Sequence, residues 1–284
     1  MVVNVLLLLL LWSNLVAVAN AEEEETYWNS SAVSQFIGGE LNRFGFSVAV
    51  SENYALVGGL PGAAIYKKIS IGGKWNTTPH AVLTSGTTDR YGLSVAITDQ
   101  YAFVGDDDGN TVYVYGNDGQ GFNTTLIRVW NGSEFSNVAP REKRNFGLSV
   151  SVAPSGNYAI VGSHVSSEGF IFARSAATGF WAVDPVLHLD FPSFEGFGAS
   201  VSITDSFALV GATWYGSDGH CEVFWFGNNI GRDQGASYWN STPIAVTNGY
   251  NAYSRFGISV QLSSDNSYAI VGARESSKAF IFGR

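Results

Sequence analysis

FGFSVAVSENYALVGG, residues 44–59, returns four more times along the chain with small changes. The copies are YGLSVAITDQYAFVGD from Tyr91, FGLSVSVAPSGNYAIVGS from Phe146, FGASVSITDSFALVGA from Phe197 and FGISVQLSSDNSYAIVGA from Phe256. Their starts lie 47, 55, 51 and 59 residues apart. Self-similarity at a period of about 50 residues indicates a repeat architecture in which each copy is one structural unit.

Each unit contains two short strands separated by a tight turn. The first strand is an aromatic-Gly-x-Ser-Val run, and the second is an aromatic-Ala-apolar-Val-Gly run. The turns, such as residues 51–53 and 98–100, are too short for a helix, and the flanking β-branched and aromatic residues favour strands. A third strand ends in an aromatic residue in every unit, at residues 64–66, 112–115, 170–172, 223–226 and 280–282.

A fourth strand is predicted after a tryptophan in four units. The tryptophans are Trp75, Trp130, Trp181 and Trp239, and the strands that follow them include residues 81–83, 138, 186–187 and 244–246. Four antiparallel strands repeating at this interval are typical of a β-propeller blade. The sequence therefore predicts an all-β, five-bladed β-propeller with four antiparallel strands per blade.

The fourth strand of the last unit is expected at the other end of the chain. The fifth unit stops at Arg284, after its third strand, while residues 27–31 (Tyr-Trp-Asn-Ser-Ser) match residues 238–242 (Tyr-Trp-Asn-Ser-Thr). We expect this N-terminal strand to complete the last blade and close the ring, because closure leaves only short sheet edges exposed. Residues 22–284 are thus predicted to form a single propeller domain.

The aromatic-Gly step resembles the FG-GAP repeat, the propeller unit of integrin alpha subunits and of many secreted proteins. Phe44, Phe146, Phe197 and Phe256 each precede a glycine, Tyr91 is a variant, and the Gly-Ala-Pro half of the motif is degenerate. The resemblance implies the propeller fold for nearly the whole mature chain. Five blades differ from the seven of integrins, so the integrin function is not carried over. Five-bladed propellers also occur among lectins and some glycoside hydrolases.

The family's calcium site is an Asp-rich loop between the first and second strands, and this chain has only short turns there. Calcium takes six to eight oxygen ligands, which those turns do not offer. No resident metal or other cofactor is predicted. The acidic run Asp106-Asp107-Asp108 lies instead between the second and third strands of the second unit, where a solvated turn is favoured over a cation site.

The N-terminus indicates secretion. Residues 1–21 read as a signal peptide, with an apolar run at residues 6–11 and the small-x-small cleavage pattern Ala19-Asn20-Ala21. The alternative is an uncleaved membrane anchor, which is disfavoured because Asn4, Ser13 and Asn14 interrupt the apolar run and no basic flank follows it. No other stretch is long enough to span a bilayer, so a secreted or cell-surface protein is expected. We also expect it to be a monomer. The net charge of −9 and the lack of a long basic run disfavour nucleic acid as a partner. Cys221 is the only cysteine, so an intramolecular disulfide is excluded.

Ligand binding is predicted at the loops that join blades and at those between the second and third strands, which emerge on one face. The candidate residues there are Arg43, Arg90, Arg144, Arg255, Trp214 and Tyr215. Planar guanidinium groups and exposed aromatic rings suit carboxylates, sulfated sugars or sugar rings. The structural alternative is that each arginine forms an ion pair with Glu40, Asp89, Glu142 or Glu195 and only supports its loop.

Five N-x-Ser/Thr sequences are candidate glycosylation sites: Asn29, Asn76, Asn123, Asn131 and Asn240. Four of them follow a tryptophan at the predicted start of an outermost strand, so glycans there would cover the rim and leave the loop face open. The sequence favours binding or adhesion to an extracellular protein or carbohydrate. A glycoside hydrolase with converging carboxylates is the second hypothesis, and a structural matrix protein is the third.

Overall fold

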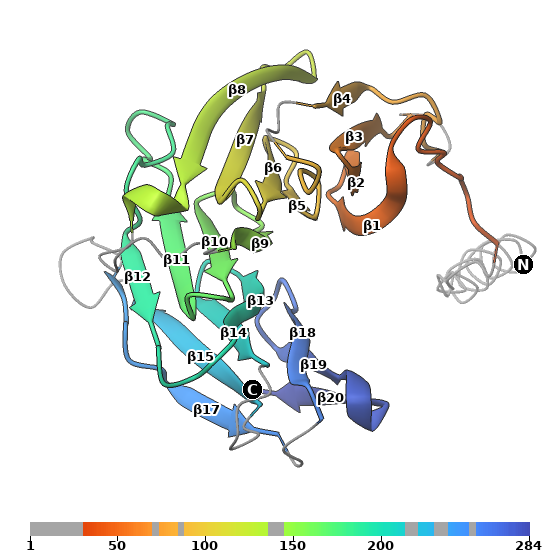
Figure 1. Ribbon diagram of the computed structural model, residues 1–284. Coiled ribbons are helices and arrows are strands. Elements are labelled where there is room, and N and C mark those ends of the chain that lie inside the picture. Colours follow the sequence, from red (N-terminus) through yellow and green to blue (C-terminus); the bar gives the residue numbers. More distant parts are fainter. Residues whose placement is uncertain are drawn as a thin grey trace, which may run out of the picture. The chain divides into compact units, whose positions relative to one another are not determined.

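The structure is a computed structural model that describes residues 31–69, 74–84, 88–135, 145–213, 221–229, 238–249 and 254–284. These residues form five antiparallel sheets that follow one another in chain order (Figure 1). All five lie within one compact unit, Ser34–Arg284. Among the described residues, the only helical segments are the short turns η1 (Gly132–Glu134) and η2 (Arg274–Ser276).

Each sheet holds the strands of one sequence repeat, and we number the sheets as blades 1 to 5. Blade 1 comprises β1 (Asn42–Val50), β2 (Tyr54–Leu60), β3 (Gly62–Lys67) and β4 (Ala81–Leu83). Blade 2 comprises β5 (Ser94–Ile97), β6 (Tyr101–Asp106), β7 (Thr111–Asn117) and β8 (Phe122–Asn131). Blade 3 comprises β9 (Phe146–Val152), β10 (Tyr158–Ser163), β11 (Glu168–Ala173) and β12 (Leu187–Asp190).

Blades 4 and 5 vary this plan. Blade 4 comprises β13 (Phe197–Ile203), β14 (Phe207–Ala212) and β15 (Glu222–Asn229), with β16 (Tyr238–Trp239) and β17 (Ala245–Asn248) both paired to β15. Blade 5 has three strands among the described residues: β18 (Phe256–Leu262), β19 (Tyr268–Ala273) and β20 (Lys278–Gly283). The first, second and third strands predicted from the repeats are therefore present in all five blades.

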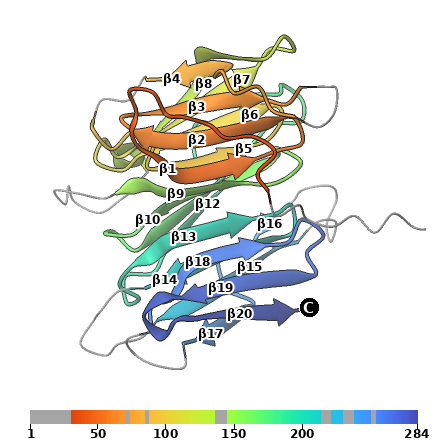
Figure 2. The ribbon, with the colours of Figure 1, turned by 90° about the vertical axis from the view of Figure 1, so that its right-hand side faces the viewer.

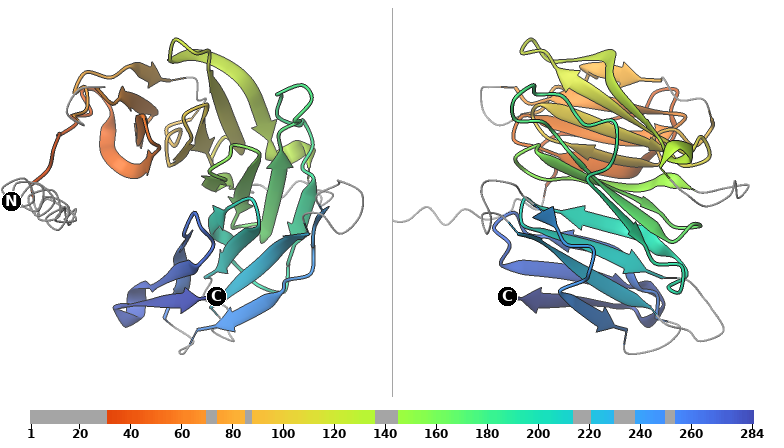
Figure 3. Two further views of the ribbon diagram at one scale, coloured as in Figure 1. Left: turned by 180° about the vertical axis from the view of Figure 1, so that it is seen from behind. Right: turned by 90° about the vertical axis from the view of Figure 1, so that its left-hand side faces the viewer.

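Consecutive blades pack face to face (Figure 2). The first strands of adjacent blades contact one another, while the outer strands β4, β8, β12 and β17 lie at the far side of each sheet (Figures 1 and 3). A separate apolar cluster fills each of the four joints between adjacent blades, and most of its largest buried side chains are aromatic. Large aromatic side chains supply the apolar area that holds neighbouring sheets together.

The serine of the aromatic-Gly-x-Ser-Val run links each blade to the next. Its hydroxyl donates to the carbonyl oxygen of the motif glycine in the following blade. The four links are Ser47 to Gly92 (2.9 Å), Ser94 to Gly147 (2.6 Å), Ser149 to Gly198 (2.9 Å) and Ser200 to Gly257 (2.6 Å). The motif therefore encodes the contact between blades as well as the strand itself.

Both motif glycines are needed where adjacent blades meet. Gly198 has a φ of +89°, in the left-handed region that disfavours a side chain. Gly162, next to the last residue of the second strand of the preceding blade, lies so close that a Cβ there would overlap the Gly198 carbonyl oxygen. This close approach accounts for glycine at both ends of the repeated unit.

The outer strands confirm the sequence prediction in three blades and correct it in one. Trp75, Trp181 and Trp239 each pair with the end of a third strand, and β4, β12 and β17 follow them. In blade 2, Phe122 holds this position through its pairing with Asn117, and β8 runs from there to Asn131. The prediction that the fourth strand of blade 2 follows Trp130 is wrong.

The predicted N-terminal strand at residues 27–31 falls almost entirely outside the described residues, so ring closure stays a prediction. Residues 22–30, which belong to the predicted propeller domain, are outside them too, as is the predicted signal peptide. Across the described ranges, no helix has the length and apolar character needed to cross a membrane.

Candidate functional site

The loops between blades and the loops between second and third strands meet at one end of the blades, as the sequence predicts. The Asn110 side chain accepts a hydrogen bond from the Phe146 backbone at 3.0 Å, and Gly62 N donates to Tyr91 O at 2.9 Å. We call this end the loop face. The turns between first and second strands lie at the opposite end, the turn face, where Asp99 accepts from Ser51 at 2.6 Å.

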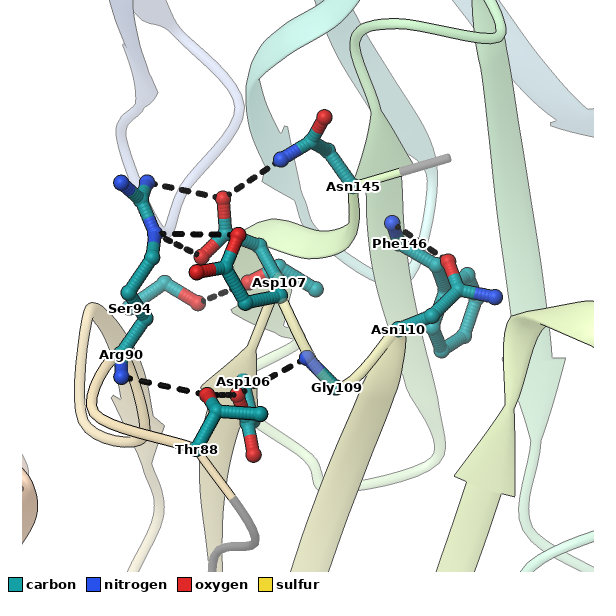
Figure 4. Close-up of polar contacts among 11 residues, drawn as sticks. Thr88, Arg90, Ser94, Asp106, Asp107, Gly109, Asn110, Asn145 and Phe146 are labelled. Atoms are coloured by element: carbon teal, nitrogen blue, oxygen red, sulfur yellow. Dashed lines mark hydrogen bonds and ion pairs between the residues drawn. The ribbon is translucent and has the colours of Figure 1, made fainter. Parts of the chain in front are cut away.

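An ionic cluster lies on the loop face where blade 2 meets blade 3 (Figure 4). Arg90 donates through Nε and Nη2 to the two carboxylate oxygens of Asp107, at 2.7 and 2.8 Å. Asn145, which begins blade 3, donates to Asp107 Oδ2 at 2.8 Å. The Asp107 side chain is fully buried, whereas that of Arg90 is 41% exposed. A buried carboxylate thus fixes a guanidinium that still reaches solvent.

The hydrogen bonds and charge of Asp107 also affect the electrostatics of Arg90. The side-chain hydrogen bond with Asp107 raises the pKa of the Arg90 guanidinium, and this outweighs the opposing effect of burial. Bidentate arginine–carboxylate pairs are among the strongest and most geometrically specific hydrogen bonds in proteins. Arg90 is therefore charged and held in one orientation.

The Asp106 side chain holds the acidic loop, residues 106–109, in place through hydrogen bonds. Its carboxylate accepts hydrogen bonds from the Thr88 hydroxyl and, at 3.1 Å, from the Gly109 backbone. Gly109 lies so close that a Cβ there would come within 2.7 Å of an Asp106 oxygen. Thr88 in turn accepts from the Arg90 backbone at 3.1 Å. These contacts hold the acidic loop and the incoming blade-to-blade loop together.

The acidic run does not fit a calcium site. Both Asp107 oxygens face Arg90, and the Asp106 carboxylate already accepts from Thr88 and Gly109. Calcium prefers a shell of six to eight oxygens without a competing cation. Within the described ranges, no group of three or more His, Cys, Asp or Glu side chains is placed to hold a metal ion.

His164, in the corresponding loop of blade 3, contributes no positive charge to the loop face at neutral pH. Burial lowers the pKa of its imidazole below the usual range, and the negative charge of Asp107 offsets only part of that effect. A neutral imidazole beside the Arg90–Asp107 pair leaves Arg90 as the cationic group of this cluster.

The other predicted arginines differ in their surroundings. Arg255 lies 3.7 Å from Glu275 of η2 and is 28% exposed, and Glu275 also pairs with Arg274 at 2.9 Å. Arg43 is exposed on β1. The carboxylate partners of Arg90 and Arg255 are Asp107 and Glu275, in the loops after second strands, rather than the predicted Glu40, Asp89 or Glu195. Arg144, Trp214, Tyr215 and Glu142 lie outside the described residues.

Four candidate glycosylation sites are described, and each Asn side chain accepts a hydrogen bond from the backbone N–H two residues ahead. Asn76, Asn123 and Asn240 are exposed at the start of the outer-strand segments, toward the turn face. Asn131 is half-buried at the end of β8, where it caps η1 on the loop face. Asn29 lies outside the described residues.

Thr88 and Asn145 belong to the ionic cluster, yet the sequence did not single them out. Asn145 has a φ of +56°, which places it in the left-handed turn before Phe146. Asparagine tolerates that conformation, so an Asn directly before an aromatic-Gly step was an available signal. The partnership of Thr88 with Asp106 depends on how two loops approach and has no local sequence pattern.

Comparison with known proteins supports the fold. No family model and no curated protein matches the chain. The solved structures that resemble it include Kuenenia stuttgartiensis hydrazine synthase, with 11% identity over 87% of this chain and 58% of that one, and a TM-score of 0.55. The periplasmic gluconolactonase PpgL of Pseudomonas aeruginosa has 15% identity over 84% of this chain and 67% of that one, with a TM-score of 0.54.

A third similar structure is the Swd1 β-propeller domain of Myceliophteria thermophila. It has 10% identity over 85% of this chain and 70% of that one, with a TM-score of 0.52. The chain thus spans between 58% and 70% of the lengths of these three solved chains. At such low identity the likeness concerns the fold alone. Together with the five antiparallel sheets, it shows that this chain has a β-propeller fold.

Proposed function

We propose that the protein is a secreted or cell-surface binding module whose loop face takes an extracellular protein or carbohydrate. The observation that supports this best is the half-exposed guanidinium of Arg90, which the buried carboxylate of Asp107 holds in place. A side chain already fixed before binding loses little conformational freedom when a ligand arrives.

The charges on the loop face favour a polar partner of mixed character. Arg90 lies beside Asp107 and Asp108, and Arg255 lies beside Glu275. Paired charges of both signs offer specific hydrogen bonds without a strong field of one sign. This modifies the sequence-based expectation that the guanidinium groups suit carboxylates or sulfated sugars, because the acidic neighbours offset the positive charges locally.

The assignment to the FG-GAP class is part of the same proposal. Its support is the repeated aromatic-Gly-x-Ser-Val unit, whose serine and glycine form the links between blades. The proposed glycans at Asn76, Asn123 and Asn240 lie toward the turn face and would leave the loop face accessible. Secretion through a signal peptide at residues 1–21, and a monomeric mature chain, complete the proposal.

A ligand screen with matched charge-reversal variants tests the proposal. The mature protein, residues 22–284, is applied to glycan and glycosaminoglycan arrays and to intact cells. The variant Arg255→Glu with Arg274→Glu reverses charges on the loop face, and we expect at least tenfold weaker capture of any ligand found. The control Glu52→Lys with Lys74→Glu changes exposed residues away from that face and should bind like the wild type.

Equal loss of binding in both variants would place the binding surface elsewhere. Release of sugar products from the arrays would replace the binding proposal with a hydrolase. These substitutions affect exposed or half-exposed side chains, and most such surface substitutions change stability little. Each variant should therefore melt within a few degrees of the wild type.

A further inference from the structure

The outer strand of blade 2 differs from the other outer strands in its length. Among the described residues, β8 has ten residues, whereas β4, β12 and β17 have three, four and four. It is the last strand of its sheet, after β7, and it lies on the outside of blade 2 (Figure 1). The open edge of a strand carries unpaired backbone N–H and C=O groups, and these can pair with a strand of another chain.

The other outer strands are kept short by a proline that β8 lacks. The fourth residue after the aromatic that begins each segment is Pro79 in blade 1, Pro185 in blade 3 and Pro243 in blade 4. Strands β4, β12 and β17 each begin two residues after their proline. In blade 2 the segment begins at Phe122, and Leu126 takes the place of the proline. Because proline has no backbone N–H to pair, its absence lets the strand in blade 2 run on through this position.

The edge of β8 is apolar as well as long. Leu126, Ile127 and Val129 are 37%, 41% and 46% exposed. The only charged side chain of the strand, Arg128, is half-buried, and its Nε is enclosed. Natural sheet edges are protected by short length, proline, exposed lysine or a bulge. Of these protections β8 has only the bulge, in which Ile127 is the extra residue of the ladder with β7.

An acceptor sequence for N-linked glycans lies at the start of this edge. Asn123, the second residue of β8, is exposed and begins Asn123-Thr124-Thr125. Its Oδ1 accepts from the Thr125 backbone at 2.8 Å, and its Nδ2 donates to Asp118 at 3.2 Å. An N-linked glycan is bulky and solubilising. A glycan on Asn123 would begin three residues from Leu126, roughly 10 Å along the strand, and could cover the apolar part of the edge.

The acceptor sequence and the proline complement each other along the blades. Asn76 and Asn240 hold the same place as Asn123, but a proline separates each of them from its short strand. Blade 3 has Ala182 at this place and keeps Pro185. Among the four described outer segments, only the segment of blade 2 combines an acceptor sequence with a long edge that no proline interrupts. A glycan is therefore most needed at Asn123.

From these observations we propose that an N-linked glycan on Asn123 covers the outer edge of β8 and keeps the chain monomeric. Without the glycan, the edge pairs with the same edge of a second copy, in a twofold dimer where each surface meets its own equivalent. This inference rests on the secretion and glycosylation that form part of the proposed function. It does not depend on the loop-face ligand, so the two proposals can fail separately.

Removal of the acceptor sequence tests the cover. The mature chain, residues 22–284, is secreted from eukaryotic cells, its glycans are located by mass spectrometry, and its mass in solution is measured by light scattering over a range of concentrations. We expect a monomeric wild type with a glycan on Asn123. Thr125→Ala removes the acceptor sequence but keeps the Asn123 side chain, and it should dimerise with a dissociation constant at least tenfold lower than the wild type.

Two matched controls keep the edge covered. Thr124→Ala changes the same exposed stretch but leaves the acceptor sequence intact, so it should stay glycosylated and monomeric. Asn76→Gln removes a glycan beside the three-residue strand β4, and it should also stay monomeric. A secreted wild type without a glycan on Asn123, or a monomeric Thr125→Ala variant, would overturn the proposal. Loop-face binding by that monomeric variant would leave the proposed function intact.

A lysine on the edge tests whether β8 is the surface that pairs. Ile127→Lys added to Thr125→Ala should restore the monomer, because an exposed lysine opposes pairing between strand edges. The matched control adds Val186→Lys instead, which places the lysine at a 53% exposed position in the outer segment of blade 3. That variant should still dimerise. Dimers that persist with Ile127→Lys, or that both lysines abolish equally, would place the pairing surface elsewhere and overturn the proposal.

Discussion

At the scale of single residues, the loop face depends on a few groups whose positions are set by the backbone. Asp107 is fully buried yet ionically paired, and its oxygens accept from both Arg90 and Asn145, so it joins two loops from adjacent blades. Burying a carboxylate is tolerated only when paired charges and hydrogen bonds compensate for lost hydration. Loss of either partner should therefore affect the stability of the joint as well as the shape of the face.

The substitution Asp107→Asn should destabilise the protein by about 1.5–3 kcal/mol, because it leaves Arg90 without its ionic partner and weakens a buried charge-assisted contact. Urea unfolding followed by tryptophan fluorescence measures the change. The matched control is Asp108→Asn, whose side chain is 42% exposed, and it should change stability by less than about 0.5 kcal/mol. Equal effects would show that the Arg90–Asp107 pair has no special role.

The substitution Gly198→Ala should destabilise the protein by about 1–3 kcal/mol, because a Cβ is strained at positive φ and would also overlap the Glu168 carbonyl oxygen. The control Gly179→Ala has a similar φ of +74° but open space around the added methyl group. The difference between their unfolding free energies measures the close approach of blades 3 and 4. If the two variants are equally stable, that approach does not constrain the glycine.

At the scale of elements, the repeat predicts the strands well but not the carboxylates that pair with the loop arginines. Three strands per blade follow from the alternating apolar runs and short turns, and the outer strands follow where a tryptophan marks their start. Blade 2 breaks that rule, because Phe122 takes the position of the tryptophan and Trp130 lies eight residues later. Identifying this required the pairing register. The ionic partners Asp107 and Glu275 come from loops whose approach depends on blade packing, which no local pattern records.

The turn between the first and second strands of blade 1 should make stability depend on pH. Asp99 of blade 2 is partly buried, which raises its pKa, but hydrogen bonds from Ser51 and Asn53 outweigh this and lower the pKa below 3.8. The contribution is fully present at neutral pH and is lost as the pH falls through the lowered folded-state value. Asp99→Asn should therefore reduce stability at pH 7 more than at pH 2.5, as measured by urea unfolding at both pH values. An equal loss at both would contradict the assignment.

At the scale of the whole molecule, the four described joints share an apolar cluster and a serine–glycine link, and three of them add an aromatic side chain from the outer-strand segment of the following blade. Contacts therefore run mainly between neighbouring blades, as in other repeat proteins where stability is built from units and their interfaces. At the described joints, side-chain hydrogen bonds such as those of Asp99 with Ser51 and of Thr204 with Asn266 tie the turns between first and second strands to the neighbouring blade.

Calcium should accordingly leave thermal stability unchanged. A ligand that binds only the folded state raises the melting temperature by mass action. We expect the mature protein to melt within about 1 °C in millimolar calcium and in chelator, because the Asp106 and Asp107 oxygens are already engaged. Differential scanning fluorimetry measures this. A rise of several degrees with calcium would show that the ion displaces Arg90 from the acidic loop.

The serine–glycine link has a consequence for how such a chain lengthens during evolution. Every unit carries the donor serine for the blade ahead and the acceptor glycine for the blade behind. A duplicated stretch of one unit would meet compatible neighbours on both sides at once, without compensating changes elsewhere. The chemistry of the joint therefore tolerates gene duplication in steps of whole units. A partial duplication would leave a linking serine or a motif glycine without its partner.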